Sequence, residues 1–204
     1  FDRGYEDPVH SIRRQSEGVY AMLHFLAYER ENGRRHPEWE QKMKNMLDIL
    51  LQLQHEDGSF PRKFHDDFTV VDNSGGSTPS ATLPLIMGYK YFKDKRYLAS
   101  AKRTADYLEK VLISKADYFS STLDANCEDK EASLYAATAT YYLSLITKGD
   151  EHRHYADLTR KAAYFALSWY YVWDVPFAQG QMLGDIGLKT RGWGNVSVEN
   201  NHID

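Results

Sequence analysis

The sequence is most restrictive in what it lacks. Its single cysteine, Cys127, excludes an internal disulfide, and with no second cysteine it cannot anchor a zinc site alone. No apolar run approaches the roughly 20 residues needed to cross a bilayer, so no membrane span is expected. Lys and Arg total 25 against 29 Asp and Glu, and no basic stripe follows the chain. Nucleic acid is therefore not an expected partner.

Motifs for metal ions and nucleotides are also missing. The 8 histidines show no metal-ligand spacing. Asp66, Asp67 and Asp72 lack the ordered spacing of a calcium loop. The glycine pair at 75–76 is too short for a phosphate-binding loop, and no lysine accompanies it. We therefore expect no metal and no cofactor.

Aromatic residues, in contrast, are abundant. The 15 Tyr, 9 Phe and 4 Trp make up 14% of the chain. A tyrosine-rich helical core accounts for most of them. Aromatic rings that remain at the surface can stack on flat ligand faces.

The pattern of apolar residues predicts an all-helical chain. Apolar side chains recur at spacings of three and four residues, which is typical of amphipathic helices. Pro37 follows His36, and proline is favoured in a first helical turn. Six helices are predicted, over residues 9–31, 37–55, 79–92, 95–113, 129–147 and 151–173.

The six helices pair into three similar hairpins. Trp39, Tyr97 and Tyr155 each lie near the start of a second helix, 58 residues apart both times. Two further registers, eight and eleven residues later, repeat with the same spacing. Agreement in three registers indicates a structural repeat, and its period is longer than that of common helical solenoids.

The connections between hairpins are much longer than the turns within them. They cover residues 56–78, 114–128 and 174–195, whereas the turns inside the pairs are short and polar. A hairpin cannot bury its apolar stripe alone, so repeated hairpins must stack side by side. If they form a ring, the long connections gather at one pole. Long loops are often functional, so a site is expected where they meet the first helices.

Three segments resemble a known superfamily. They are the glutamine-rich helix ending with Asp-Gly-Ser-Phe at 51–61, the acidic stretch 124–132, and the stretch 190–202. Together they resemble the six-hairpin glycosidase superfamily, whose relatives include unsaturated glucuronyl hydrolase-like and other bacterial glycan-degrading enzymes. The resemblance implies a single all-α domain over 1–204, with about three of the six hairpins of an (α/α)6 toroid. The chain is then expected to be a fragment of a larger toroid.

The connections carry candidate catalytic carboxylates. Glycoside hydrolysis commonly uses two carboxyl groups that flank the scissile bond. Asp67 and Asp129 are the preferred pair. Asp124, Glu128, Asp129 and Glu131 lie within eight residues, and like charges this close raise one another's pKa. Acidic residues there also complement a helix N-terminus, which explains one or two of the four.

Other residues in the connections suit sugar binding. The Phe64 ring can stack on a sugar, and the carboxylates of Asp66 and Glu128 can accept hydrogen bonds from sugar hydroxyls. Trp193, between two glycines, can serve as a second stacking surface. Arg191 suits a uronate carboxylate, because its planar fork binds carboxylates in a bidentate manner. The alternatives are that Asp66 and Asp67 are solvated loop charges and that Trp193 packs beneath its loop.

Three functional readings remain open. The first is a glycoside hydrolase acting on an oligosaccharide or polysaccharide, including one with acidic sugars. The second is a polysaccharide lyase in which Asn201 neutralises a uronate and His202 removes its proton. The third is a helical repeat that binds a glycan or a protein without catalysis. The resemblance favours a periplasmic or secreted location over a cytoplasmic one. Three hairpins alone are expected to be inactive, because a six-hairpin site draws its walls from both halves.

Overall fold

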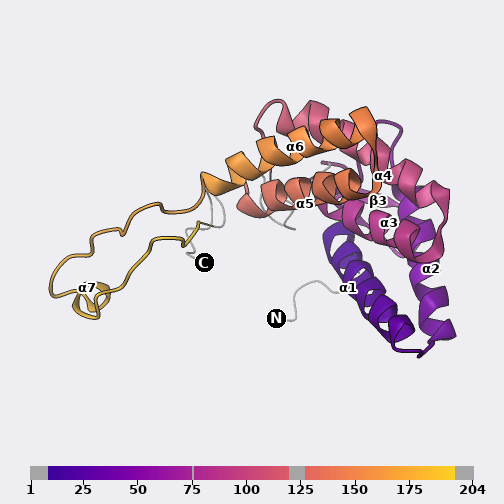
Figure 1. Ribbon diagram of the computed structural model, residues 1–204, viewed down its shortest axis with the longest axis horizontal. Helices are drawn as coiled ribbons and strands as arrows, with labels where there is room; N and C mark the ends of the chain where they lie inside the picture. The colour runs from indigo at the N-terminus through magenta and orange to yellow at the C-terminus, as the bar shows by residue number, and fades with distance from the viewer. Residues whose placement is uncertain (1–8, 75, 120–126, 196–204) are drawn as a thin grey trace.

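The chain folds into three helical hairpins followed by a long projecting segment (Figure 1). The structure is a computed structural model and describes residues 9–74, 76–119 and 127–195. The elements, in chain order, are β1 (His10–Ser11), α1 (Ile12–Glu31), α2 (Pro37–Leu53), β2 (Lys63–Phe64), β3 (Val70–Asp72), α3 (Thr78–Phe92), α4 (Lys95–Tyr107), the π-helical segment η1 (Leu108–Ile113), α5 (Lys130–Ile146), α6 (Gly149–Leu167) and the short α7 (Met182–Asp185).

The six predicted helices are confirmed, most of them within three residues of the expected bounds. The fourth continues as η1 after Tyr107. The sixth ends at Leu167, six residues before the predicted end at 173. It ends early because the backbone beyond it pairs across the third connection. The N–H of Tyr171 donates to the carbonyl of Trp193, and the N–H of Asn195 donates to that of Trp169.

A small antiparallel sheet was not predicted. Its strand order is β1-β2-β3, with His10 opposite Phe64 and Phe64 opposite Val70. Each strand has only two or three residues, which is too short for a period-two pattern to stand out in sequence. The sheet attaches the first connection, residues 54–77, to the start of α1.

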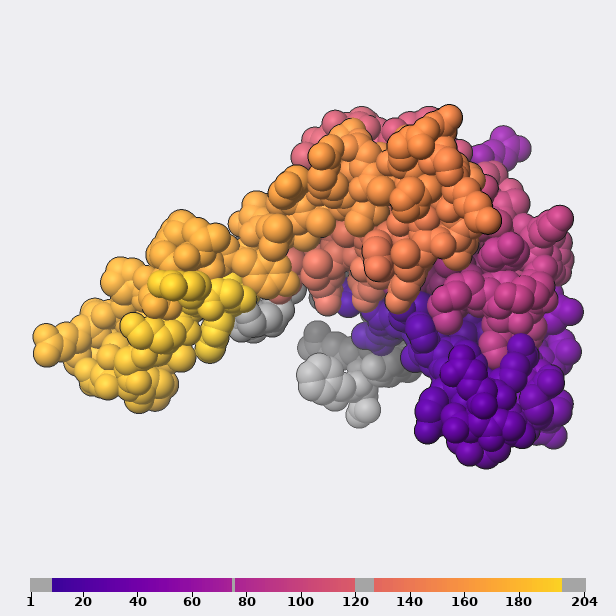
Figure 2. All heavy atoms as spheres, in the orientation of Figure 1, coloured from indigo at the N-terminus to yellow at the C-terminus, as the bar shows by residue number. Residues whose placement is uncertain are grey.

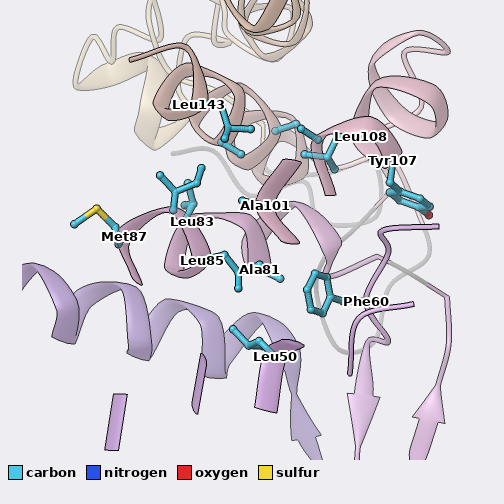
Figure 3. Close-up of a cluster of buried hydrophobic side chains, with 14 of the residues drawn as sticks. Leu50, Phe60, Ala81, Leu83, Leu85, Met87, Ala101, Tyr107, Leu108 and Leu143 are labelled. Carbon is cyan, nitrogen blue, oxygen red and sulfur yellow. The ribbon is translucent and has the colours of Figure 1, made fainter. Parts of the chain in front are cut away.

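The three hairpins form two layers. In the inner layer α3 contacts both α1 and α5, whereas α4 and α6 pack behind α3 and α5. Helix α3 is buried on nearly every side, from Thr78 to Gly88, as expected of a helix with neighbours all around it. Figure 3 shows side chains from different elements meeting in this core, including Leu50 of α2, Phe60 of the first connection, Leu85 of α3 and Leu143 of α5.

The junction after α2 explains the Asp-Gly-Ser-Phe motif. Asp57 accepts hydrogen bonds from the N–H and the hydroxyl of Ser59, at 2.9 and 2.7 Å. Gly58 has φ +91°, and a Cβ there would lie 2.1 Å from the carbonyl oxygen of Arg103. Phe60 follows and is fully buried. The motif is therefore a turn that packs the first connection against α4.

Gln54 fastens the same junction to the second hairpin. Its Nε2 donates to the carbonyls of Gly58 and Ser100 and to the hydroxyl of Thr104. Its Oε1 accepts from the Ser100 hydroxyl at 2.7 Å. Every polar atom of this amide is thus used, which accounts for a glutamine at the end of α2.

The long connections gather at one pole, as predicted. The N–H of Ile12 at the start of α1 donates to the carbonyl of Arg62, and the N–H of Phe60 donates to the hydroxyl of Thr78 at the start of α3. At the start of α5, the ammonium group of Lys130 lies 5.2 Å from the centre of the Tyr170 ring, at the root of the third connection. The short turns lie at the opposite ends of the helices (Figure 1).

The 58-residue repeat holds closely for two hairpins and loosely for the third. Trp39 and Tyr97 are both the third residue of their helix, whereas Tyr155 is the seventh. Tyr97 is fully buried, but Trp39 is 40% exposed and contacts the rings of Phe25 and His36. The difference follows from position, because α2 belongs to the first described hairpin and has a neighbouring hairpin on one side only among the residues that the structure describes.

In the part of the chain that the structure describes, no helix is both long and apolar enough to span a membrane.

Candidate functional site

Side chains from α1 and α5, the two helices that flank α3, contact each other and form the α1/α5 polar cluster. This cluster is defined as Arg13, Glu17, Glu131 and Tyr135. The Nε of Arg13 donates to Glu17 at 2.9 Å, and another guanidinium nitrogen lies 2.8 Å from Glu131. The Tyr135 hydroxyl donates to the same oxygen of Glu17. Arg13 therefore holds two carboxylates from two helices that are not neighbours in the inner layer.

Burial and hydrogen bonding shape the ionisation of this cluster. Burial lowers the pKa of Arg13, but hydrogen bonds to Glu17 and Glu131 outweigh it and hold the pKa above its ordinary value. Burial, reinforced by the hydrogen bond to Glu17, raises the pKa of Tyr135. Arg13 thus stays cationic and Tyr135 stays a neutral hydrogen-bond donor across the physiological range. Glu17 and Glu131 keep side-chain exposures of 42% and 36%, so a ligand can reach them.

The same face continues along both helices. One turn beyond Glu17, the hydroxyls of Tyr20 on α1 and Tyr142 on α5 are 3.0 Å apart. The Tyr20 ring also meets the His24 ring edge-on, at 4.6 Å. Burial and then Lys90 lower the pKa of His24. Contacts between α1 and α5 across α3 require the inner layer to curve, so these side chains line its concave side. Figure 2 shows the third connection, at the yellow end of the colour scale, reaching away from the packed helices.

Glu128 lies two residues before α5 and pairs with Phe119 in an isolated antiparallel bridge. Burial, with added contributions from Asp117 and Asp129, raises its pKa above the ordinary carboxyl value. Its carboxylate accepts a hydrogen bond from the N–H of Tyr118 at 3.1 Å. Of the acids predicted to act together here, Asp129 adds to the rise in the pKa of Glu128, after burial and Asp117. A carboxyl whose pKa is raised in this way is better suited than an ordinary carboxyl to donate its proton.

The two predicted catalytic aspartates occupy different environments. Asp129 is fully buried and caps α5, with its carboxylate accepting the N–H of Glu131 at 2.7 Å. Asp67 lies in the exposed turn between β2 and β3 and accepts the N–H of Thr69 at 2.9 Å. Hydrogen bonds from Thr69 lower its pKa. Asp129 thus organises a helix start and Asp67 a turn, and both remain candidates for chemistry on sequence grounds.

Phe64 and Asp66 come together in a second place, the His10 pocket. This cavity of about 260 Å³ is lined by His10, Gln15, Met46, Ile49, Phe64, Asp66 and Phe68. The Nε2 of His10 lies 2.5 Å from the Asp66 carboxylate. Both predicted binding residues therefore line one cavity, at the connection pole and beside the start of α1.

Arg191 and Trp193 lie elsewhere, in the third connection. This segment extends away from the helices and carries α7 at its far end (Figure 1). The guanidinium of Arg191 is 3.8 Å from Asp174 in the same segment, and its side chain is 70% exposed. Trp193 is 38% exposed and anchors the base of the segment through its backbone. The structure does not bring either residue to the His10 pocket.

Asn201 and His202 lie outside the described residues, so their predicted role as a lyase pair stays a prediction. Within the described ranges, no group of three or more His, Cys, Asp or Glu side chains is arranged to hold a metal ion.

Sequence reasoning missed most of the α1/α5 polar cluster. Arg13, Glu17 and Tyr20 follow one another at helical spacings of four and three residues, and Glu131, Tyr135 and Tyr142 do so at four and seven. These two polar stripes beside apolar stripes were visible signals.

The comparisons with known proteins agree with this architecture. No family model matches the chain. Among solved structures, it is similar to an unsaturated glucuronyl hydrolase specific for heparin (18% identity, TM-score 0.62, covering 86% of this chain and 50% of that one). It is also similar to a D-mannose isomerase (13%, 0.58, 82% and 45%) and to a sugar epimerase from a ruminal bacterium (11%, 0.59, 97% and 50%).

These neighbours are all six-hairpin α/α toroid proteins, so the predicted fold class is confirmed. The chain spans about half the length of each of them. Identities this low establish a shared fold, and the chain has the architecture of half an α/α toroid.

Proposed function

We propose that the chain is part of a carbohydrate-active toroid of the glycoside hydrolase-like kind, whose substrate lies along the concave face of α1, α3 and α5. The observation that carries this proposal is the α1/α5 polar cluster. It presents charged carboxylates, a guanidinium and tyrosine hydroxyls on one curved face, at the pole where the long connections meet. Such a mixture of rings and hydrogen-bonding groups suits a hydroxylated ligand.

The solved structures that resemble this chain also support a carbohydrate ligand. One is a hydrolase of an unsaturated glucuronyl group, one an isomerase of mannose and one an epimerase of sugars. What they share is a sugar ligand, while their reactions differ. The similarity therefore supports carbohydrate as the ligand class more strongly than any single reaction.

For hydrolysis, Glu128 is the proposed proton donor, because burial and neighbouring acids raise its pKa. Glu131, which Arg13 holds at 2.8 Å, is the proposed charged partner. The pair first inferred from sequence, Asp67 and Asp129, stands beside them as the alternative. In that alternative Asp129 would act from its buried position at the start of α5, two residues before Glu131.

The experiment is a binding and turnover assay on the chain and on any longer polypeptide that contains it. Neutral and uronate-containing oligosaccharides are titrated by calorimetry, and products are followed by reducing-end release and by ultraviolet absorbance. We expect the chain to bind an oligosaccharide, and Arg13→Met to weaken binding at least about tenfold, since charge-assisted hydrogen bonds contribute about 1.5–3 kcal/mol.

Glu128→Gln and Asp67→Asn separate the two assignments of the proton donor. We expect the first to abolish turnover in a longer, active polypeptide and the second to spare it; the reverse result would favour the pair inferred from sequence. An absorbing unsaturated product would indicate elimination instead of hydrolysis. Failure of every oligosaccharide to bind, in the chain and in the longer polypeptide, would overturn the proposal.

A further inference from the structure

The His10 pocket combines polar side chains at its mouth with aromatic rings on one side. His10 on β1 and Asp66 beyond β2 face each other at 2.5 Å, and the amide of Gln15 lies 3.4 Å from the other ring nitrogen of His10. His10 and Asp66 keep side-chain exposures of 34% and 79%. The polar groups thus stand at the mouth of the cavity with hydrogen-bonding capacity left for a ligand.

The opposite side of the pocket is aromatic. The Phe64 and Phe68 rings stack with centroids 6.4 Å apart, and the Phe64 and His10 rings are 5.3 Å apart. Phe64 is buried, but Phe68 is 39% exposed at the hairpin between β2 and β3. A ring that borders the cavity and remains accessible is available as a stacking platform.

Phe68 is also held in a strained backbone conformation. Its φ is +68°, in the left-handed region that favours glycine, and its N–H donates to the carbonyl of His65 at 2.9 Å. A bulky residue in this region costs roughly 1–2 kcal/mol. Glycine or asparagine would close the same turn without that cost. Strained backbone conformations of this kind are concentrated at ligand-binding and active sites, where the side chain has a functional role.

The size of the space sets the class of ligand. The cavity of about 260 Å³ is slightly smaller than the roughly 300–1,000 Å³ of pockets for drug-sized molecules, so it suits one ring. A second cavity of about 560 Å³ adjoins it along α1 and α2 and shares Gln15 and Met46. The rest of an oligosaccharide whose end ring is bound in the His10 pocket can therefore extend into the second cavity.

We propose that the His10 pocket is a second sugar subsite, which takes a neutral pyranose ring at the end of an oligosaccharide. The ring stacks on Phe68, and its hydroxyls bond to Asp66, His10 and Gln15. The exposed Asp66 carboxylate accepts hydroxyl hydrogens and repels a uronate. This inference rests on the proposed function, but it concerns a place apart from the α1/α5 polar cluster.

The test is a two-dimensional NMR titration of the chain with methyl β-glucopyranoside and, in parallel, with methyl β-glucuronide. We expect the neutral glycoside to shift the signals of His10, Gln15 and Phe68, and the charged one to bind more weakly. Phe68→Gly is the decisive variant. It relieves the left-handed strain, so thermal stability should be unchanged or higher, while affinity for the glycoside falls about three- to tenfold.

Asp66→Asn should weaken binding by a similar factor, and it serves if Phe68→Gly fails to fold. The matched control is Val71→Ala on β3, an exposed residue that does not line the cavity, and it should bind as the wild type does. Undiminished affinity in Phe68→Gly, or shifts confined to Arg13 and Tyr135, would overturn the subsite and leave the proposed function standing. If no oligosaccharide or glycoside binds at all, both fall.

Discussion

Two parts of the connection pole differ sharply in how they are packed. The packed pole comprises the first two connections and the helix starts that they join. There Phe60 is 0% exposed and Phe64 is 4% exposed. In the third connection, which begins at residue 168 in the structure because α6 ends at Leu167, Trp173 is 60% exposed and Met182 is 75% exposed. The first and the third connections both contain aromatic residues and glycines, so composition does not account for the difference.

Neighbouring hairpins account for it. The first connection lies between two hairpins and is fastened to α4 by Gln54 and to α3 by Thr78. The third connection follows the last described hairpin and meets the helices only near its base, around Tyr170. Its apolar side chains have no described hairpin on their far side. Within the described residues, the connection that lies between two hairpins is packed against them, and the connection with no described hairpin after it stays largely exposed.

The largest expected difference comes from removing one ring in each part. Phe60→Ala should lower the free energy of unfolding by about 3–5 kcal/mol, because it empties a fully buried site. Trp173→Ala, at an exposed position, should change it by less than about 0.5 kcal/mol. Urea denaturation of both variants checks this contrast. Equal losses would mean that the third connection is packed in solution.

Two glycines with positive φ sharpen the comparison. Gly58→Ala places a Cβ 2.1 Å from a backbone oxygen of α4 at φ +91°, so we expect a loss of about 2–4 kcal/mol. Gly180 in the third connection has φ +80° but nothing within 4 Å. Its alanine variant should therefore cost only about 1 kcal/mol, from backbone strain alone. Thermal denaturation measures both, and a similar shift in the two would refute the packing argument.

Two arginines give a smaller contrast. Arg13→Met should destabilise the fold by about 1.5–3 kcal/mol, since it removes hydrogen bonds to two carboxylates and leaves Glu17 and Glu131 facing each other. Arg191→Met removes an exposed ion pair with Asp174 and should cost less than about 0.5 kcal/mol. Arg13→Lys, which keeps the charge but not the fork, should fall between them. A harmless Arg13→Met would show that the cluster does not hold α1 to α5.

The smallest expected effect is in pH dependence, where the two parts have opposite signs. Burial raises the pKa of Glu128, so the folded state holds this proton more tightly than the unfolded chain. Glu128 therefore costs stability as the pH rises from about 4.3 through the raised pKa. Glu128→Gln should be the more stable protein at neutral pH, with no advantage below about pH 4.

Asp174 behaves in the reverse way. The backbone N–H of Arg191 is the main cause that lowers its pKa, so it contributes stability above about pH 3.9 that is lost as the pH falls through the lowered pKa. Asp174→Asn should remove that contribution at neutral pH. Melting temperatures of both variants across the acid range check the signs, and two shifts in the same direction would contradict the assignment.

Much of the fold was predictable from the sequence, for local reasons. The three-and-four spacing of apolar residues located all six helices, and Pro37 marked the start of α2 as expected. The end of α6 was not predictable. It depends on hydrogen bonds between residues near 170 and residues near 194, and no local pattern reports such a pairing.

The candidate site was only partly predictable. Phe64 and Asp66 were singled out and do share a pocket, but His10 and Phe68 complete it from segments that gave no motif. Arg13 and Glu131 meet across 118 residues of chain only because the inner layer curves.

The sequence by itself determined the helices, the hairpin repeat and the long connections, because these follow from apolar periodicity and turn residues within a few positions of one another. Only the tertiary structure decided which polar side chains share a surface. It placed α1 and α5 on either side of α3, so that their polar stripes meet, and it left the third connection extended. Those outcomes depend on packing between segments far apart in the chain, and packing of that kind is set by the whole chain and not by any one stretch of it.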